Sequence, residues 1–314
     1  MRFFEKQHLR SMVPYFFLVA LVIFFTIVNP VFFSERNLYN LLRQMSILLV
    51  VSTAATYVIL MGSIDLSVGA ILTMSGIIMA RYIESFGLWS IFIGVAIGLI
   101  SGLLNALIFV YFGIPSFLAT LGTNSMFLGI AYLICGGTPV TYNRPDFRWI
   151  STGNILGGFP VLAIWAGIIY ALACFISIKT RFGRYVFAIG GGEKVAELSG
   201  VLVNRYKAAT MCLSGLLCGI AGVLMTARIG AATPEMGLDS LLESIAATVM
   251  AGTALSGGVG GPIRTFMGVI IIAMLSSGLT IMGVHVFTQL LVKGMVVILA
   301  VAMNMEKSRL ELIK

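Results

Sequence analysis

The sequence predicts an all-α, polytopic membrane protein of about ten transmembrane helices, with its N- and C-termini in the cytoplasm. Of the 314 residues, 59% are hydrophobic and only 10% are charged, whereas a soluble domain typically carries about 25% charged residues. The mean hydropathy is +1.04, and the apolar stretches reach the roughly 20 residues that a spanning helix needs. They are apolar on every face, unlike the alternating strands of a membrane β-barrel.

The first helix is expected in the apolar run from Val13 to Phe33, which follows a basic stretch at the N-terminus. A signal peptide has a shorter apolar core and a cleavage site of small residues, so this run is interpreted as an uncleaved helix. Basic residues flank the cytoplasmic ends of membrane helices. The N-terminus is therefore placed in the cytoplasm.

Nine further helices are expected, and an even total returns the C-terminus to the cytoplasm. This topology also leaves most of the 20 Lys and Arg residues on the cytoplasmic side, as the positive-inside rule requires. The second and third helices, and the eighth and ninth, are close enough in sequence to be partly broken or re-entrant. The nine ranges are Leu42–Met61, Leu66–Glu84, Trp89–Phe112, Pro115–Ile134, Pro160–Ile178, Ala208–Arg228, Leu241–Leu255, Ile263–Met282 and Val286–Met303.

Two connections are long and polar. Cys135–Phe159 is assigned to the outside, and Lys179–Lys207, which holds six Lys and Arg residues, is assigned to the cytoplasm. Within the second, Glu193–Ser199 reads as a two-turn helix followed by a glycine, Gly200, at its C-terminal cap. The loop either merely connects two helices or forms a docking surface, and its length favours docking, because a connector needs only a few residues.

The sequence argues against an enzyme. The histidines, His8 and His285, have no nearby carboxylates or cysteines that would form a metal site or a catalytic triad. The Gly-x-x-x-x-Gly-Lys-Ser/Thr phosphate loop is absent from the sequence. We therefore expect no catalytic residue, metal or cofactor, and any ATP hydrolysis on a separate chain. The net charge of +8 follows from cytoplasmic Lys and Arg, so no nucleic-acid partner is expected. The four cysteines lie in apolar stretches and read as small buried residues.

One candidate for the transport path is the turn Gly62–Gly69 between the second and third helices, which contains Asp65 and Ser67. A carboxylate beside membrane helices is costly unless it meets water, a donor or a helix N-terminus. Asp65 either caps the third helix or takes part in the path or its gate, since transporters expose backbone groups at such breaks.

A second candidate is a polar stripe on the fifth helix. Its members fall on one helical face by their three- and four-residue spacing, so they are expected to face a cavity or another helix. They either form hydrogen bonds between helices or line a path for a polyhydroxylated solute. The stripe comprises Ser116, Thr120, Thr123 and Asn124.

Small residues recur on the fourth and seventh helices, at Gly94, Gly98, Ser101 and Gly102 and at Gly215, Gly219 and Gly222. This spacing lets helices approach closely, so a packing role is expected. Lys293 lies deep in the last apolar run, where it either snorkels toward the interface or pairs with an internal carbonyl or acid.

Six segments together resemble the permease subunits of bacterial ATP-binding-cassette importers for monosaccharides, the ribose-type group of the ribose/branched-chain amino acid permease family. The resemblance runs from the second helix to the end of the chain, and the segments occur in the order typical of the family. They are Gly-Ser-Ile-Asp-Leu-Ser-Val-Gly (62–69), Pro-Ser-Phe-Leu-Ala-Thr-Leu-Gly-Thr (115–123), Gly-Arg-Tyr-Val-Phe-Ala-Ile-Gly-Gly (183–191), Ser-Gly-Val-Leu-Val-Asn (199–204), Ala-Gly-Thr-Ala-Leu-Ser-Gly-Gly-Val-Gly (251–260) and Val-Lys-Gly-Met-Val-Val-Ile-Leu-Ala-Val (292–301).

The resemblance implies one permease domain over residues 1–314 in the bacterial inner membrane, with residues 179–207 as its cytoplasmic coupling loop. It implies three partners: an ATP-binding-cassette ATPase, a periplasmic sugar-binding protein and a second permease subunit, identical or paralogous. The family often has Asn where this chain has Gly192. The coupling residues that it implies are Gly190, Gly191, Glu193, Ala196, Glu197 and Gly200.

The leading interpretation is thus a permease that passes a monosaccharide inward by alternating access, driven by a separate ATPase. Two alternatives stay open. One is a permease for another small solute, such as a branched-chain amino acid. The other is an ion-coupled secondary transporter, which normally needs ionisable residues within the spans; here only Lys293 lies clearly within one, and Asp65 lies at an edge.

Overall fold

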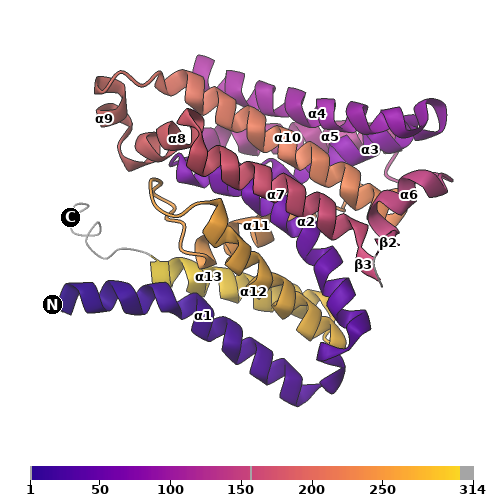
Figure 1. Cartoon of the computed structure of the whole chain (residues 1–314). Coiled ribbons are helices and arrows are strands. Elements are labelled where there is room, and N and C mark those ends of the chain that lie inside the picture. The colour runs from indigo at the N-terminus through magenta and orange to yellow at the C-terminus, as the bar shows by residue number, and fades with distance from the viewer. Residues whose placement is uncertain (1, 156–157, 305–314) are drawn as a thin grey trace.

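The computed structural model describes residues 2–155 and 158–304. These residues form mostly helices, and the longest run side by side (Figure 1). The first part of the chain forms α1 (Arg2–Val28), the 3-10 turn Pro30–Phe33, α2 (Glu35–Leu60), α3 (Val68–Phe86), the 3-10 turn Gly87–Trp89, α4 (Ser90–Ala106), the π-helical turn Leu107–Tyr111, α5 (Ser116–Cys135), β1 (Val140–Thr141), α6 (Pro145–Thr152), β2 (Asn154–Ile155) and β3 (Phe159–Pro160). The second part forms α7 (Val161–Lys179), α8 (Arg181–Gly191), α9 (Glu193–Leu198), α10 (Val203–Ile229), β4 (Ala231–Ala232), α11 (Leu238–Met250), α12 (Pro262–Ile281) and α13 (Val286–Asn304).

Six helical stretches in the described part are long and apolar enough to cross a membrane. One of them, Val68–Tyr111, covers both α3 and α4. Two shorter apolar stretches, Pro14–Val28 and Val286–Leu299, belong to α1 and α13. A helix occurs in each of the ten predicted ranges, whereas ten membrane crossings and cytoplasmic termini stay predictions. In Figure 1, α1 begins and α13 ends on the side of the bundle where α8 and α9 lie.

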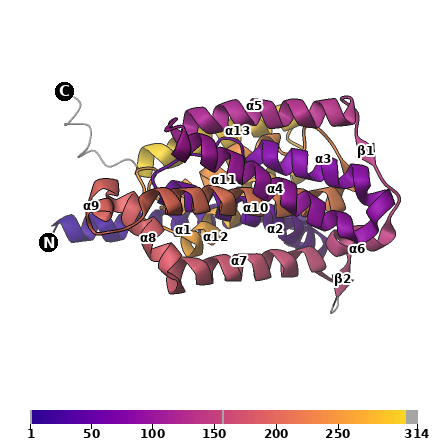
Figure 2. The same cartoon turned by 90° about the horizontal axis from the view of Figure 1, so that it is seen from above.

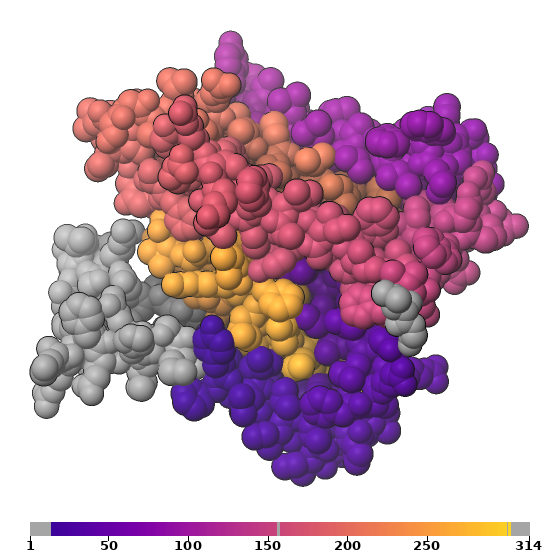
Figure 3. Space-filling view, in the orientation of Figure 1, coloured from indigo at the N-terminus to yellow at the C-terminus, as the bar shows by residue number. Residues whose placement is uncertain are grey.

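The bundle is built around α2 and α10. From Met45 to Leu60 every residue of α2 is buried, and a helix that is apolar all round is typical of a buried core. In Figure 2, α5 and α7 lie on opposite sides of the bundle. Figure 3 shows α12 at the surface between α7 and the N-terminal helices. α1 packs on α12 through Phe25, whose ring lies against Gly278.

α4 and α10 touch at the glycines that the sequence singled out. A Cβ on Gly98 would lie 2.5 Å from the carbonyl oxygen of Gly215, and one on Gly102 would lie 2.5 Å from that of Met211. Real side chains do not tolerate such distances. The predicted packing role is therefore confirmed for these residues.

Short elements cover the end of the bundle opposite α8 and α9. β1 pairs antiparallel with β4, Val140 opposite Ala232, and β2 pairs with β3. The sequence analysis missed α6, which lies inside the loop Cys135–Phe159 and inserts the fully buried Phe147. A hydrogen bond from Arg144 to Asp146 anchors its start and lowers the pKa of the Asp146 carboxyl to about 2.

Replacing Gly215 with Val tests the contact between α4 and α10. The added atoms meet backbone rather than a flexible side chain, so we expect a loss of roughly 1–3 kcal/mol of stability, the usual range for overpacking. Thermal unfolding in detergent measures the change. Gly167→Val on α7 is the matched control, because a Cβ there meets nothing within 4 Å among the described residues. Equal unfolding temperatures for the two variants would contradict the packing role.

Candidate functional site

Asp65 lies in the non-helical turn between α2 and α3, and only 5% of its surface is exposed. Its Oδ1 accepts hydrogen bonds from the amide of Ser67 (2.9 Å) and from the Ser67 hydroxyl (2.6 Å). Its Oδ2 accepts one from the hydroxyl of Ser214 on α10 (2.9 Å). The carboxylate therefore closes its own turn and ties that turn to the central helix.

The hydrogen bonds continue from this turn into α4 and α5. The Asn105 amide donates to the Ser67 hydroxyl (2.7 Å) and accepts from the Thr123 hydroxyl (2.6 Å). Backbone amides of the turn donate to α5, from Ile64 to Ser116 (3.2 Å) and from Leu66 to Thr120 (2.9 Å). We call this set the polar network: Asp65, Ser67, Asn105, Ser116, Thr120, Thr123 and Ser214.

The polar network bears on the structural interpretations of Asp65 and of the stripe on α5. Ser67, and not Asp65, occupies the N-cap position of α3. The Asp65 carboxylate instead accepts a hydrogen bond from the Ser67 amide, two residues later, as in an Asx turn. On α5, Ser116, Thr120 and Thr123 bond other helices or the turn, as the interhelical reading predicts. Asn124, the fourth member of the predicted stripe, is only half-buried, and no hydrogen bond joins it to this network.

The predicted cytoplasmic loop is largely helical. It contains α8, which the sequence analysis missed, and then α9, close to the expected short helix. Gly200, at a φ of +82°, follows the last turn. Its amide donates a hydrogen bond to the Glu197 carbonyl (2.9 Å), and the Val201 amide donates one to the Ala196 carbonyl (3.1 Å). These two bonds form a Schellman motif.

α9 turns apolar side chains outward. Ala196 is buried, whereas Val195 is 69% exposed and Leu198 is 79% exposed. On the same element Glu197 pairs with Lys194 (3.0 Å), and Glu193 pairs with Lys207 of α10 (2.7 Å). Exposed apolar side chains that lie together often mark a surface that binds another protein.

Three backbone segments meet without intervening side chains where α8 ends. We call this contact the glycine junction. It consists of Leu60–Gly62 at the end of α2, Gly190–Gly191 at the end of α8, and Gly257–Gly258 in the loop before α12. The Gly258 amide donates to the Leu60 carbonyl (2.9 Å). A Cβ on Gly190 would lie 2.5 Å from the Gly258 nitrogen and closer still to the Leu60 oxygen.

The two glycines at the end of α8 differ, although the family resemblance groups them. A Cβ on Gly191 would meet nothing within 4 Å among the described residues. A side chain at position 190 would therefore clash with the backbone of Leu60 and Gly258, whereas one at position 191 would point into open space.

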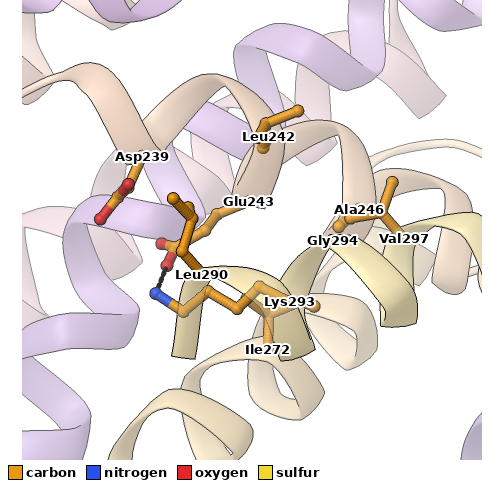
Figure 4. Close-up of a pocket in the computed structure, with 9 residues that line it drawn as sticks. All are labelled: Asp239, Leu242, Glu243, Ala246, Ile272, Leu290, Lys293, Gly294 and Val297. Carbon is orange, nitrogen blue, oxygen red and sulfur yellow. Dashed lines mark hydrogen bonds and ion pairs between the residues drawn. The ribbon is translucent and has the colours of Figure 1, made fainter. Parts of the chain in front are cut away.

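The sequence analysis left Lys293 without a named partner. Lys293 of α13 pairs with Glu243 of α11 at 2.5 Å, and their side chains are only 16% and 15% exposed (Figure 4). The signal was present, since Glu243 is an acid inside the predicted helix Leu241–Leu255. Fifty residues separate the two, and helix spacing cannot pair residues that far apart.

Asp65 variants test whether the carboxylate stabilises the fold. Asp65→Ala removes the acceptor for Ser67 and Ser214, so we expect a loss of roughly 1–3 kcal/mol, the cost of buried groups left without partners. Asp65→Asn keeps one carbonyl acceptor and an amide that Ser214 can accept from, so a smaller loss is expected. Thermal unfolding measures both. If Asp65→Ala unfolds at the wild-type temperature, the network is not a structural tie.

Comparison with known proteins places this geometry in a family. Residues 37–301 match the model of the branched-chain amino acid transport system / permease component family. The ribose import permease protein RbsC of Bacillus subtilis (strain 168) is 40% identical over 299 residues, covering 94% of this chain and 92% of that protein. RbsC of Escherichia coli (strain K12) is 34% identical over 312 residues, covering 98% and 97%.

A further relative is named for a different sugar. The D-allose transport system permease protein AlsC of Escherichia coli (strain K12) is 32% identical over 295 residues, covering 92% of this chain and 90% of AlsC. No solved structure matched. The family model spans the turn at Asp65, the segment of α8 and α9, and the ion pair alike. The chain therefore belongs to the branched-chain amino acid transport system / permease component family.

Proposed function

We propose that the chain is the membrane-spanning permease subunit of an ATP-driven monosaccharide importer in the bacterial inner membrane. It receives the sugar from a periplasmic binding protein and passes it to the cytoplasm by alternating access. A separate ATPase supplies the energy, and a second permease subunit, identical or paralogous, completes the path. The observation that carries the proposal is similarity to permeases named for ribose and D-allose over nearly the whole chain.

In this proposal the ATPase docks on α9. Two features support that role: the exposed Val195 and Leu198 offer an apolar contact, and the exposed Glu197 adds charge beside them. Glu193 has a second task, because its pair with Lys207 holds α9 against α10. The remaining coupling residues, Ala196 and Gly200, shape the helix and its end.

Movement of α9 reaches the membrane helices through the glycine junction. A single residue, Gly192, joins α8 to α9, and Gly190 of α8 contacts the Leu60 carbonyl at the end of α2. Backbone contacts have no side-chain rotamers that could absorb a displacement. A push on α9 therefore acts on the turn that holds Asp65, and through the polar network on α4, α5 and α10.

The family description favours one second candidate, a permease for a branched-chain amino acid. The two candidates share the fold, the ATPase and the docking surface, and they differ in solute. A test of function must therefore offer both kinds of solute to the same preparation.

The proposed function is tested by reconstitution in vesicles with a candidate ATP-binding-cassette ATPase and a candidate sugar-binding protein. We expect uptake of D-ribose or D-allose that requires ATP, and ATP hydrolysis that rises with the sugar-loaded binding protein. Leucine uptake in place of sugar uptake would select the second candidate. Uptake driven by a proton gradient without the ATPase would overturn both.

Gly190→Ala tests the coupling route, with Gly191→Ala as its matched control. The Gly190 methyl group forces the junction apart, so we expect sugar uptake to fall about tenfold or more while ATP hydrolysis continues. The Gly191 methyl group enters open space and is expected to leave both rates near the wild type. A Gly190→Ala transporter that imports at the wild-type rate contradicts the coupling route.

A further inference from the structure

α4 does not end as a regular α-helix but in a π-helical turn, Leu107–Tyr111, which we call the π-turn. The Phe112 amide that follows it donates to the Leu107 carbonyl (3.3 Å), five residues back instead of four. A turn of this kind holds one extra residue, and such turns occur frequently at functional sites. The winding of α4 is therefore irregular at the end that leads into α5.

Packing separates the π-turn from the rest of α4. Up to Ala106 the helix is held firmly, because the backbones of Gly98 and Gly102 touch α10 and Ala106 is buried. The five residues of the π-turn are exposed or half-buried, and Tyr111 is 83% exposed. Segments with few buried contacts rearrange at low free energy. The π-turn can therefore rewind while the rest of α4 stays on α10.

The π-turn lies between two members of the polar network. Asn105 precedes it, and Ser116 begins α5 after it. In Figure 2, α9 and the start of α5 lie at the same end of the bundle. A π-turn that rewinds into an α-turn passes its extra residue onward, which shifts the following segment by about 1.5 Å and about 100°. This displacement reaches Ser116, which accepts the hydrogen bond from the Ile64 amide.

Lys207 of α10 connects the π-turn to α9. Its Nζ lies 5.1 Å from the centre of the Phe109 ring, which belongs to the π-turn. The same Nζ lies 2.7 Å from Oε1 of Glu193 on α9, and the Lys207 side chain is only 14% exposed. Ammonium groups are attracted to aromatic faces, and partly buried charges are screened little by salt. One ammonium thus holds α9 and the π-turn together.

We propose that Lys207 is a positioning residue of the transport cycle, which sets the winding of the π-turn according to the position of α9. While Glu193 holds Lys207 in place, the ammonium holds the Phe109 ring and the π-turn keeps its extra residue. When the ATPase displaces α9, Lys207 follows Glu193, the ring is released and the start of α5 shifts. The inference rests on the proposed function and adds to it a second route, from α9 to α5, beside the glycine junction.

Lys207→Gln tests the role of the charge in the reconstituted transporter. We expect the amount of sugar imported per ATP hydrolysed to fall about fivefold or more, because the ion pair and the contact with the Phe109 ring are lost together. Lys207→Arg keeps the charge, and a guanidinium also stacks on aromatic rings. This variant should therefore import most of the wild-type amount per ATP.

Lys179→Gln is the matched control. Lys179 ends α7, is exposed, and forms no ion pair among the residues that the structure describes. The same change there should leave the amount of sugar imported per ATP at the wild-type value. A Lys207→Gln transporter with the wild-type ratio contradicts the proposal, and so does an equal loss in Lys207→Gln and Lys207→Arg.

Spin labels at the exposed Phe92 and Tyr111 measure the winding directly, once the free cysteines are replaced by alanine. Phe92 lies on the firmly packed part of α4 and Tyr111 lies in the π-turn. We expect ATP binding to change the distance between the two labels in the otherwise wild-type transporter and to leave it unchanged in Lys207→Gln. A distance that ATP does not change in either protein overturns the proposal.

The outcomes separate this role from the proposed function. ATP-dependent sugar uptake by the wild type reports on the function, and the ratio of variant to wild type reports on Lys207. Wild-type uptake together with an unimpaired Lys207→Gln variant overturns the role of Lys207 and leaves the function standing. Blue-native gels report whether the ATPase stays bound. Its loss from the Lys207→Gln assembly assigns the ion pair to docking alone, which also overturns the proposal.

Discussion

Wherever a helix breaks inside this bundle, the freed polar groups must find partners within the protein, because lipid offers none. The turn between α2 and α3 shows how this is done. Its amides bond Ser116 and Thr120, and its Asp65 carboxylate bonds Ser67 and the Ser214 hydroxyl. Ser116 and Thr120 lie on α5 and Ser214 lies on α10, so one break fixes the positions of both helices.

Glycine provides the second constraint, since it lets backbones touch. Between α4 and α10 this contact brings two backbones together, and at the glycine junction it connects the end of α8 to two turns. The glycine junction and the polar network adjoin each other, because Gly62 belongs to the junction and Asp65 follows it by three residues. Backbone contacts thus connect the end of α8 to the turn that carries the polar network.

The sequence predicted what depends on composition and local spacing. Long apolar runs located the main helices, the three- and four-residue spacing put Ser116, Thr120 and Thr123 on one face, and Gly200 marked the end of α9. It missed α6 and α8, because short amphipathic helices in polar stretches lack a long apolar signal. One of its two interpretations of Asp65, as the cap of α3, is wrong because the turn extends two residues further than expected and Ser67 occupies the cap position.

Local sequence patterns could not predict contacts between residues that lie far apart in the chain. Asn105 meets Ser67 across 38 residues and Ser214 meets Asp65 across 149. Nothing in the sequence distinguishes Gly190, which is enclosed by backbone, from Gly191, which is not. The sequence also showed the charge of Lys293, but only the fold shows that its partner is Glu243.

The central claim is that α9 and the glycine junction move as one body during transport. Distances between spin labels, measured by pulsed electron–electron double resonance in the assembled transporter, test this claim. The free cysteines are first replaced by alanine. Spin labels are placed at the exposed Val195 and Val259. A third, at Trp89, gives a reference pair with Val195 across the bundle. The account predicts that ATP binding shifts the distance from Val195 to Trp89 and leaves that from Val195 to Val259 unchanged. A shift of equal size in both pairs would contradict it.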